Sequence, residues 1–443
     1  SRPYPLDLKL TMGATNVHVA GNFTAPVKLK GIDAKLDVSG SNMADLFYIT
    51  GIPLPPTPPY KLSGTLNRQT DEWAYNNFSG TVGDSDLAGN LTYDTSGERG
   101  FLKAELSSKM VDIDDLGGFI GAAPAVGPGE TAAPSQVKQA HVEEQSPHLL
   151  PDTPINLKRL RAADMNVALK IDKLMAPHLP FKGMDVVFNL KNGLLTIDPM
   201  KLSLADGVAD GKLRLDGRKD IPAFATTVDL KKLRLARFFE GSRFEEETQG
   251  TFGAHLDLAG NGLSLADILA DSNGKTLFLM EGGRISLLLV EAADIDLAEA
   301  TPLLLGEDKS TQIRCAVGDF KVSHGVLNSE IFILDTMDTK LKGDVAINLK
   351  NETIDAVFDA HPKDESPFSL QSPVVVRGSL KHPSVMLEPV ETGLRATGAV
   401  VLGALLTPFA AIIPFLEVGD EENSNCGALI AAAKNDTPPP QSQ

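Results

Sequence analysis

The sequence of 443 residues predicts a mostly β protein in which many short strands form one long sheet. Apolar and polar residues alternate in run after run, and this alternation is typical of strands with one buried face. A unit of Gly, a polar residue and an alternating run recurs at irregular intervals, for example from Gly89, Gly211 and Gly343. Helical stretches are too few to connect parallel strands. These three observations indicate that one strand unit is used repeatedly along an elongated antiparallel sheet.

The apolar residues of the alternating runs are candidates for lining a binding face. Alternate side chains of a strand share one face, so the apolar members of each run lie on the same side. The predicted helices cannot cover all of these strands, and a large uncovered apolar face usually marks a binding site. Acyl chains suit such a face, because burying each CH₂ contributes about 0.8 kcal/mol. The candidates are Val167, Leu169, Ile171, Val186, Phe188, Leu190, Leu213, Leu215, Leu256, Leu258, Val345, Ile347 and Leu349.

Five segments are expected along the chain. Residues 1–120 form a strand-rich body with short helices, and residues 155–392 continue it. Residues 121–154 are rich in Pro, Ala and Gly and have little to bury, which predicts a flexible linker or long loop. Residues 393–433 hold an apolar helical segment, and residues 434–443 a disordered tail. Short helices are expected at 42–49, at 230–240, after the capping residue Ser264 and within 286–305.

The C-terminal apolar segment contains an uncharged run over residues 396–416. This run is about as long as the roughly 20 apolar residues that cross a bilayer. Pro408 and Pro414 interrupt it, and proline breaks helical hydrogen bonding. It therefore either spans a bilayer, lies kinked in the membrane interface or packs into a groove of the protein itself. The candidate membrane contacts are Val400, Val401, Leu405, Leu406, Phe409, Ile412, Ile413, Phe415 and Leu416.

Composition excludes several classes of partner. The formal net charge of −17 argues against nucleic acid, whose phosphates require a basic surface. No polybasic run stands beside the apolar segment, so membrane contact is expected to depend on apolar burial and not on anionic headgroups. The two cysteines, Cys315 and Cys426, leave two interpretations open: buried thiols in a reducing compartment, or a disulfide in an oxidising one.

Catalytic and metal-binding motifs are not found. The eight histidines show no metal-ligand spacing, and the sequence lacks a Walker loop and C-x-x-C, so we expect no metal, no cofactor and no enzymatic activity. The string from Gly83 to Leu87 is similar to the serine block of GDSL-type hydrolases, but no partner Asp-x-x-His follows it. We therefore predict a hairpin turn there. The acidic residues from Asp112 to Asp115 lack the glutamate of a calcium loop and are expected to begin a helix.

Several co-linear strings carry a family resemblance. They are Asp45 to Gly51 followed by Pro55 to Tyr60, Gly80 to Leu91, Asp112 to Gly121, Asp271 to Gly274 and Ser372 to Gly378, together with the prolines of the apolar segment ahead of Cys426. In these strings the chain resembles the AsmA family of bacterial envelope proteins. The resemblance extends over nearly the whole chain except the expected linker, and none of the strings is a catalytic motif.

The resemblance implies a fold, a location and a function. The fold is a twisted, U-shaped antiparallel β-groove of the chorein type, with a few short helices and an apolar lining. Such grooves are implicated in moving phospholipids between the inner and outer membranes. The expected location is the periplasm of a Gram-negative bacterium, with an inner-membrane helix preceding Ser1 in the full-length protein. Because that compartment is oxidising, the resemblance also implies a Cys315–Cys426 disulfide.

The resemblance and the residues leave two classes of function open. In the first, the partners are phospholipid acyl chains and the two membranes. In the second, the protein is a structural or assembly factor for outer-membrane protein biogenesis or envelope organisation. It would then contact outer-membrane or periplasmic proteins, for instance by pairing an exposed strand edge with a partner strand.

Overall fold

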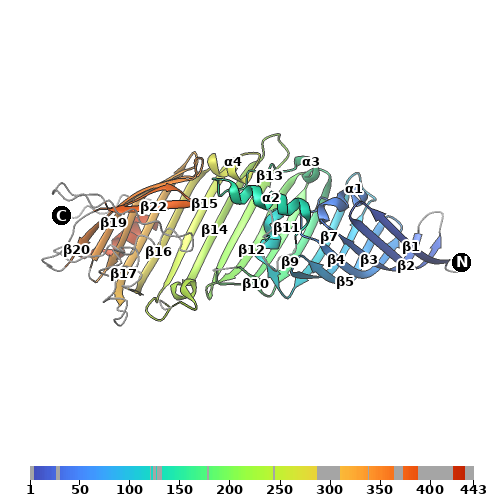
Figure 1. Ribbon diagram of the computed structural model, residues 1–443, viewed down its shortest axis with the longest axis horizontal. Coiled ribbons are helices and arrows are strands. Elements are labelled where there is room, and N and C mark those ends of the chain that lie inside the picture. Colours follow the sequence, from blue (N-terminus) through green and yellow to red (C-terminus); the bar gives the residue numbers. More distant parts are fainter. Residues whose placement is uncertain are drawn as a thin grey trace.

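The structure is a computed structural model that describes residues 4–25, 30–119, 121–122, 126, 132–176, 179–242, 245–286, 310–337, 339–363, 373–387 and 423–434. These residues form one elongated sheet of twenty strands, with short helices at its edges and on its faces (Figure 1). The sheet is open, since no described hydrogen bonds join its first strand to its last. The predicted mostly β fold with few short helices is therefore confirmed.

The strands follow one another across the sheet in chain order, from edge strand β1 to edge strand β22. The first part of the sheet contains β1 Tyr4–Met12, β2 Thr15–Ala25, β3 Lys30–Gly40, β4 Tyr60–Gln69, β5 Glu72–Val82, β6 Ser85–Asp94, β7 Gly100–Ser108 and β9 Ala163–Ile171. The second part contains β11 Phe181–Lys191, β12 Leu194–Leu204, β13 Gly207–Asp216, β14 Ala223–Arg234, β15 Thr251–Asn261, β16 Asn273–Ser286, β17 Ser310–Ser323, β18 Val326–Thr336, β19 Thr339–Asn348, β20 Thr353–Pro362, β21 Val374–Ser379 and β22 His382–Leu387. A separate short parallel pair consists of β8 Val111–Asp112 and β10 Leu174–Met175.

One pairing departs from the expected antiparallel order. Strands β7 and β9 run parallel, with Gly100 opposite Ala163 and Ser108 opposite Ile171. Parallel neighbours need a long crossover connection, because the chain must return to the opposite edge of the sheet. Residues 109–162 provide this connection, so the sheet is antiparallel on both sides of a single parallel junction.

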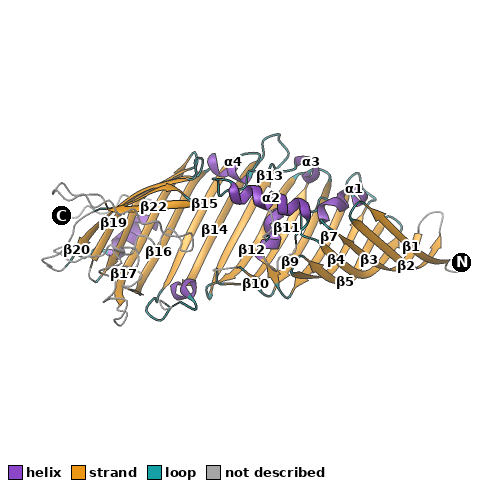
Figure 2. Ribbon diagram, in the orientation of Figure 1, coloured by secondary structure: helices purple, strands orange, loops and turns teal. Residues whose placement is uncertain are grey.

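The helices are short and lie mainly near the strand ends (Figure 2). They are η2 Met43–Leu46, α1 Phe47–Thr50, η3 Ile113–Phe119, α2 Pro134–Gln145, α3 Leu157–Leu160, η4 Leu235–Phe239, α4 Leu265–Ala270 and α7 Cys426–Lys434. Asn42 and Ser264 cap η2 and α4, as the sequence predicts. The helix expected over 230–240 is shorter, because β14 continues to Arg234 before η4 begins. Strand β16 extends to Ser286, and the rest of the helix expected within 286–305 lies outside the described residues.

Helix α2 lies within the segment that we expected to be a flexible linker or long loop. Composition was misleading here, because a helix can begin at proline when proline occupies its first turn. Pro134 holds that position, and the Gln136 side chain accepts a hydrogen bond from the Ala133 backbone N–H at 3.0 Å. The expectation of a structureless segment is therefore wrong for residues 134–145.

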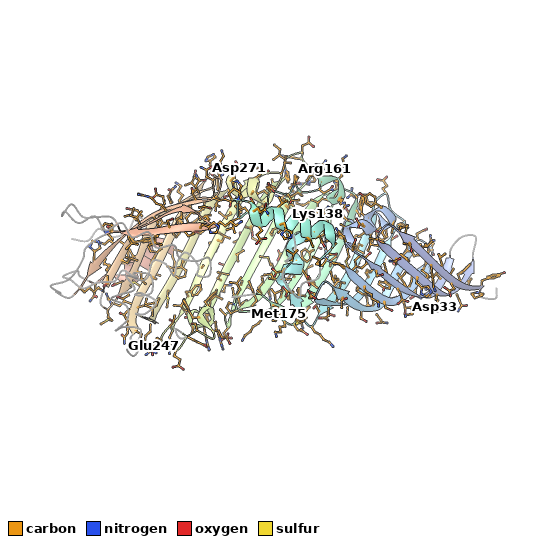
Figure 3. The ribbon with its side chains drawn as sticks, in the orientation of Figure 1. Asp33, Lys138, Arg161, Met175, Glu247 and Asp271 are labelled. Carbon is orange, nitrogen blue, oxygen red and sulfur yellow. A yellow bond between two sulfur atoms is a disulfide. The ribbon has the colours of Figure 1, made fainter. Side chains whose placement is uncertain are left out.

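The two long edges of the sheet can be named after the helices that they carry. The α4 edge holds the β11–β12, β13–β14 and β15–β16 connections, and the η4 edge holds the β12–β13 and β14–β15 connections. By register, Asp33 lies near the α4 edge, as do Arg161 and Asp271. In Figure 3, however, Arg161 and Asp271 lie at the top of the view and Asp33 lies low at the N-terminal end. The sheet is thus twisted along its length, as strand chirality requires.

The strand registers place apolar residues on one face of the whole sheet. One row of paired residues runs Leu169, Val186, Met200, Gly211, Val228 and Leu256 across β9 and β11–β15. The residues between them in sequence face the other way and are largely polar, as in the ion pairs Asp210–Lys231 and Asp229–His255. We call the two sides the apolar face and the polar face.

The apolar face is packed shut at the C-terminal end of the sheet. Phe320 of β17 belongs to the same buried cluster as Val374 and Val376 of β21 and Val385 of β22. In the sheet, β21 and β22 are the fourth and fifth strands after β17. They can share a buried cluster with β17 only if the sheet curls so that its apolar face closes on itself. Phe358, whose side chain is fully buried, lies in this cluster.

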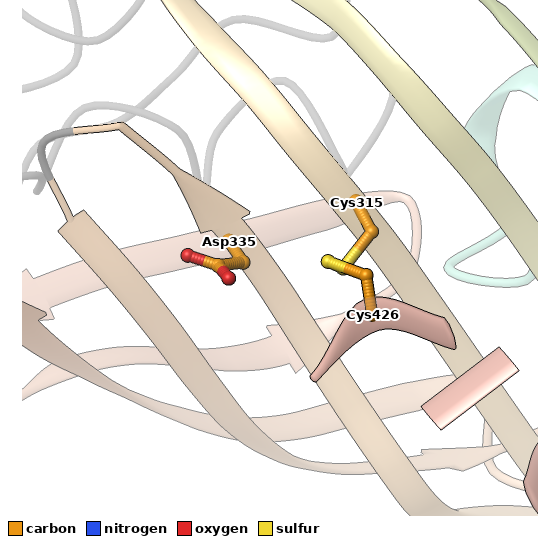
Figure 4. Close-up of side chains that lie close together, drawn as sticks. All are labelled: Cys315, Asp335 and Cys426. Carbon is orange, nitrogen blue, oxygen red and sulfur yellow. A yellow bond between two sulfur atoms is a disulfide. The ribbon is translucent and has the colours of Figure 1, made fainter. Parts of the chain in front are cut away.

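The polar face carries an apolar area over β16–β18, and α7 covers it. Leu277, Leu279, Val317, Ile331 and Ile333 of β16–β18 pack against residues 429, 430 and 433 of α7. Figure 4 shows the Cys315–Cys426 disulfide that joins the start of α7 to β17, with Cα atoms 5.9 Å apart. The disulfide implied by the family resemblance is therefore confirmed.

A buried carboxylate supports the same contact. The Asp335 side chain is 0% exposed; it pairs with Arg314 at 2.9 Å and with Lys363, and it accepts a hydrogen bond from the Ser424 backbone N–H at 2.9 Å. Asp335 and the two cysteine sulfurs lie within 4.8 Å of one another, but the sulfurs are bonded to each other and do not form an open ligand set.

Reduction of the disulfide is expected to loosen α7 from the polar face. The chain contains only two cysteines, so a reductant has no other disulfide to act on. Loss of a native disulfide typically costs about 2–5 kcal/mol, so amide exchange in α7 and β17 should accelerate strongly under reducing conditions. Hydrogen exchange by mass spectrometry measures this, with β2 and β3 as the internal control. Unchanged protection of α7 would contradict the expectation.

Asp335→Ala is expected to destabilise β17 and β18 by about 3–5 kcal/mol, because it leaves buried cations without a counter-charge. The matched control is Asp210→Ala on the polar face, where an exposed pair contributes only about 0–1 kcal/mol. The free energy of local opening, taken from hydrogen exchange of β17 and β18 peptides, distinguishes the two variants. Equal changes in the free energy of local opening would show that the buried ion pairs of Asp335 contribute no more to stability than the exposed pair of Asp210.

Candidate functional site

The candidate site is the part of the apolar face formed by β9 and β11–β15, which we call the central apolar face. Besides the row that contains Val186, a second row runs Val167, Phe188, Ile197, Leu213, Thr226 and Leu258. Neighbouring members of a row lie one strand spacing apart, about 4.8 Å. The two rows together form an apolar strip that crosses six strands without a charged residue.

Most of the middle of this strip is half-buried, although Val186 (2% exposed) and Leu258 (7% exposed) within it are buried. Val167, Leu169, Phe188, Leu213 and Leu256 are all partly exposed. Residues nearer the strand ends, such as Leu190 at 2% exposure, are buried. Small elements cover the strand ends: at the α4 edge Leu157 and Leu160 of α3 approach Gly217 and the backbone of α4 approaches Gly260, and at the η4 edge Ile113 and Leu116 of η3 pack on the cluster of Ile171. Among the described residues, no second sheet or long helix layer packs on the middle of the strip, so it is an apolar floor between covered edges.

The N-terminal part of the apolar face is covered by the segment between β3 and β4. Met43, Leu46 and Leu54 of this segment pack on Tyr60 and Phe78 of the sheet. The segment reaches across to the α4 edge, where the guanidinium of Arg159 lies 5.1 Å from the Phe47 ring centroid. The central apolar face therefore lies between two packed ends, one near β4–β6 and the other near β17–β22.

Helix α2 connects these two ends. At its start, Gln136 Nε2 donates a hydrogen bond to the Thr57 carbonyl at 2.6 Å, just before β4. After its end, the carboxylate of Glu352 accepts hydrogen bonds from the Leu149 and Leu150 backbone, and Lys381 Nζ donates to the Ser146 carbonyl at 2.6 Å. Figure 1 shows α2 lying in front of the central strands. By register, its two anchors are at opposite edges of the sheet, one before β4 and the other at the turns of β19–β22.

Charges at the rims of the site are mostly paired. At the η4 edge, Asp206 accepts hydrogen bonds from Lys182 and from Arg237 Nε, which lower the pKa of Asp206 to about 2. At the α4 edge, Asp216 binds Arg218, and this hydrogen bond lowers the pKa of Asp216 to about 2. These carboxylates stay ionised at neutral pH, so the rims are polar on both sides of an apolar floor.

The structure brings most of the predicted groove residues together. The candidates Val167, Leu169, Ile171, Val186, Phe188, Leu190, Leu213, Leu215, Leu256 and Leu258 all belong to the central apolar face by register. Val345 and Ile347 share the apolar face but lie in the closed C-terminal cluster, and Leu349 lies in the turn after β19. The candidate membrane contacts from Val400 to Leu416 lie outside the described residues.

Residues of β12 and β14 are part of the site, although the sequence patterns did not single them out. Ile197 and Met200 both point to the apolar face because a bulge lies between them, and it breaks the alternation that a sequence pattern can detect. Val228 of β14 completes the row. The interruption of an otherwise alternating run at Asp198–Pro199 was the available signal for the bulge.

The string from Gly83 to Leu87 forms a turn, as predicted. It connects β5 and β6, and the Ser85 hydroxyl donates a hydrogen bond to Asp115 Oδ2 at 2.5 Å. Burial raises the pKa of Asp115, whose carboxylate also accepts the Asp84 and Ser85 backbone N–H groups. The serine thus has a structural partner, and η3 begins with the acidic residues that were expected to start a helix.

An elongated open sheet with one continuous apolar face defines a protein of the β-groove class. The family model of the AsmA family matches residues 1–332, so the chain belongs to the AsmA family, as its motifs indicated. Membership of this family indicates a role in the bacterial envelope.

A comparison with curated proteins supports the same assignment. The chain is 26% identical over 438 residues to the AsmA family protein YhjG of Escherichia coli (strain K12), covering 98% of this chain. It spans 64% of the length of that relative. No solved structure matches the chain. In the described ranges, no helix is both long and apolar enough to cross a membrane.

Lys381→Ala is expected to loosen the C-terminal anchor of α2. Lys381 Nζ contacts the Glu144 and Ser146 carbonyls, and hydrogen bonds from charged groups contribute about 1.5–3 kcal/mol each. Exchange of amides in residues 134–150 should therefore accelerate about tenfold or more. The control is Lys350→Ala, which removes an exposed lysine from the neighbouring β19–β20 turn. Identical exchange in both variants would mean that Lys381 does not hold the helix.

Proposed function

We propose that this protein binds phospholipid acyl chains along its central apolar face and carries phospholipids between the inner and outer membranes. The observation that supports this most directly is the half-buried apolar strip, which runs across six strands without a charge. An apolar surface of this extent is stable in water only if something covers it. An acyl chain covers it at a gain of about 0.8 kcal/mol for each buried CH₂.

The same surface suits movement as well as binding. Consecutive rows of the strip present similar apolar side chains, so a chain that shifts from one strand to the next exchanges one set of contacts for an equivalent set. No catalytic group is needed for this process, and we propose a non-enzymatic protein that needs no metal or cofactor. Nucleic acid is not a partner in this proposal, given the net charge of −17.

A periplasmic location fits this proposal. Membership of an envelope-associated family supports it, and so does the Cys315–Cys426 disulfide, because structural disulfides persist in oxidising compartments. We propose that the acyl-binding face operates there, with the inner and outer membranes as donor and acceptor of lipid.

One feature favours the alternative of an assembly factor. Strand β1 pairs only with β2 among the described residues, and its side chains are almost all exposed. A free strand edge of this kind can bind a partner strand from an outer-membrane or periplasmic protein. In that case the central apolar face would have a different occupant, or none.

The proposed function is tested by native mass spectrometry of the purified chain followed by lipid extraction. Phe188→Asp and Leu213→Asp place a carboxylate on the central apolar face, and we expect bound phospholipid to fall about tenfold or more, because an ionised group beside an acyl chain lacks a hydrogen-bond partner. Ala225→Asp is the matched control, since Ala225 is exposed on the polar face opposite Arg214. It should retain lipid at the wild-type level.

The contrary results are equally specific. A wild-type chain free of lipid and unable to take it up from vesicles would overturn acyl binding and favour the assembly role. Equal lipid loss in all three variants would place the lipid somewhere other than the central apolar face. Circular dichroism of each variant checks that the sheet is intact.

A further inference from the structure

In strands β1–β7 the apolar face carries one described charge. Among the paired residues of these strands whose side chains are described, only Arg68 is charged at neutral pH and lies on this face. Far along the sheet, the register also places Arg284 of β16 on it. Arg68 lies near the end of β4, opposite Ile32 of β3 and Trp73 of β5. This position is on the same long edge as α4 by register. An arginine is costly on an apolar surface unless something compensates its charge.

Within the described residues, no carboxylate compensates the Arg68 guanidinium. Most other described arginines pair with an acid, for example Arg99 with Asp164 at 3.0 Å and Arg377 with Asp355 at 2.8 Å. No described ion pair joins Arg68 to any acid, although Asp71 and Glu72 follow in the next turn. Its Nε is buried and has no hydrogen-bond partner. The guanidinium therefore keeps its capacity to bind an anion.

Trp73 holds the guanidinium in place. Arg68 Cζ lies 4.4 Å from the centroid of the Trp73 ring, and Trp73 packs in turn against the buried cluster of Val19, Ile32 and Ala34. Stacking on an aromatic face orients an arginine while leaving its terminal N–H groups available. The planar guanidinium presents several N–H donors beside an apolar surface, and this combination is complementary to a phosphate that carries acyl chains.

We propose that Arg68, held by Trp73, binds the phosphate of a phospholipid whose acyl chains lie on the apolar face of the neighbouring strands β1–β3, on the N-terminal side of the packed end near β4–β6. This inference rests on the proposed function and adds a headgroup contact to it. The occupant is assigned from complementarity: the apolar surface accepts the acyl chains, and the Arg68 guanidinium accepts the phosphate anion.

The test uses Trp73, which is the single tryptophan of the chain, as a local fluorescence probe. The full chain is titrated with short-chain phosphatidylglycerol below its micelle concentration, with diacylglycerol of the same chain length, and with inorganic phosphate. Phosphatidylglycerol should change the Trp73 emission at the lowest concentration. Arg68→Gln should weaken its binding about tenfold to a hundredfold, which is the range that a charge-assisted hydrogen bond provides, and should leave diacylglycerol binding unchanged.

Two further variants complete the experiment. Arg214→Gln removes an arginine from the polar face and should bind phosphatidylglycerol as the wild type does. Arg68→Lys keeps the charge but loses the fork and should show an intermediate affinity. Because substitution of Arg68 alters Trp73 emission directly, native mass spectrometry of bound lipid provides the second readout for every variant.

Each contrary outcome has a separate meaning. If Arg68→Gln binds phosphatidylglycerol as tightly as the wild type, the headgroup contact is wrong although acyl binding stands. If inorganic phosphate competes as strongly as the phospholipid, the site binds free phosphate and the lipid assignment is overturned. If neither lipid binds the wild-type chain at any site, the proposed function itself fails.

Discussion

The structure depends on a register that keeps the apolar side chains of twenty strands on one face of the sheet. Strand side chains alternate with a period of two, so a slip of one residue in any pairing would turn the apolar set of that strand to the opposite side. Where a strand carries an extra residue, as in β12, β14 and β18, a bulge restores the register. The continuity of the apolar face is therefore built strand by strand, and the site inherits its shape from the pairing of its neighbours.

A sheet with one apolar face must bury that face, and this protein does so unevenly. At the C-terminal end the sheet curls until β17 and β21 share a core around Phe358, and near the N-terminus the segment after β3 packs on Tyr60 and Phe78. Between these ends the strip around Phe188 and Leu213 is only partly covered. The packed ends supply stability, and in the proposed function the partly exposed middle holds the ligand.

Elements that cross the strands tie together parts of the sheet that are far apart in order. Helix α2 joins the start of β4 to the turns of β19–β22. It belongs to the crossover connection of residues 109–162, which the parallel pairing of β7 with β9 requires. On the opposite face α7 covers an apolar area of β16–β18 and is fixed by Cys315–Cys426 and by contacts to Asp335. The described contacts of α2 are polar and lie at its two ends, whereas α7 combines an apolar contact with the disulfide.

The sequence by itself determined the strand-rich class, the shared face of residues such as Val167 and Leu169, the caps at Asn42 and Ser264, and the family. These features are local, because alternation and capping involve residues close in the chain. Only the tertiary structure decided that Val345 lies in a closed core while Leu213 is partly exposed, that residues 134–145 form a helix, and that Arg68 stacks on Trp73 on the apolar face. Burial, curling and pairing depend on residues distant in sequence, so a period of two reveals which residues share a face but not which part of that face the rest of the molecule covers.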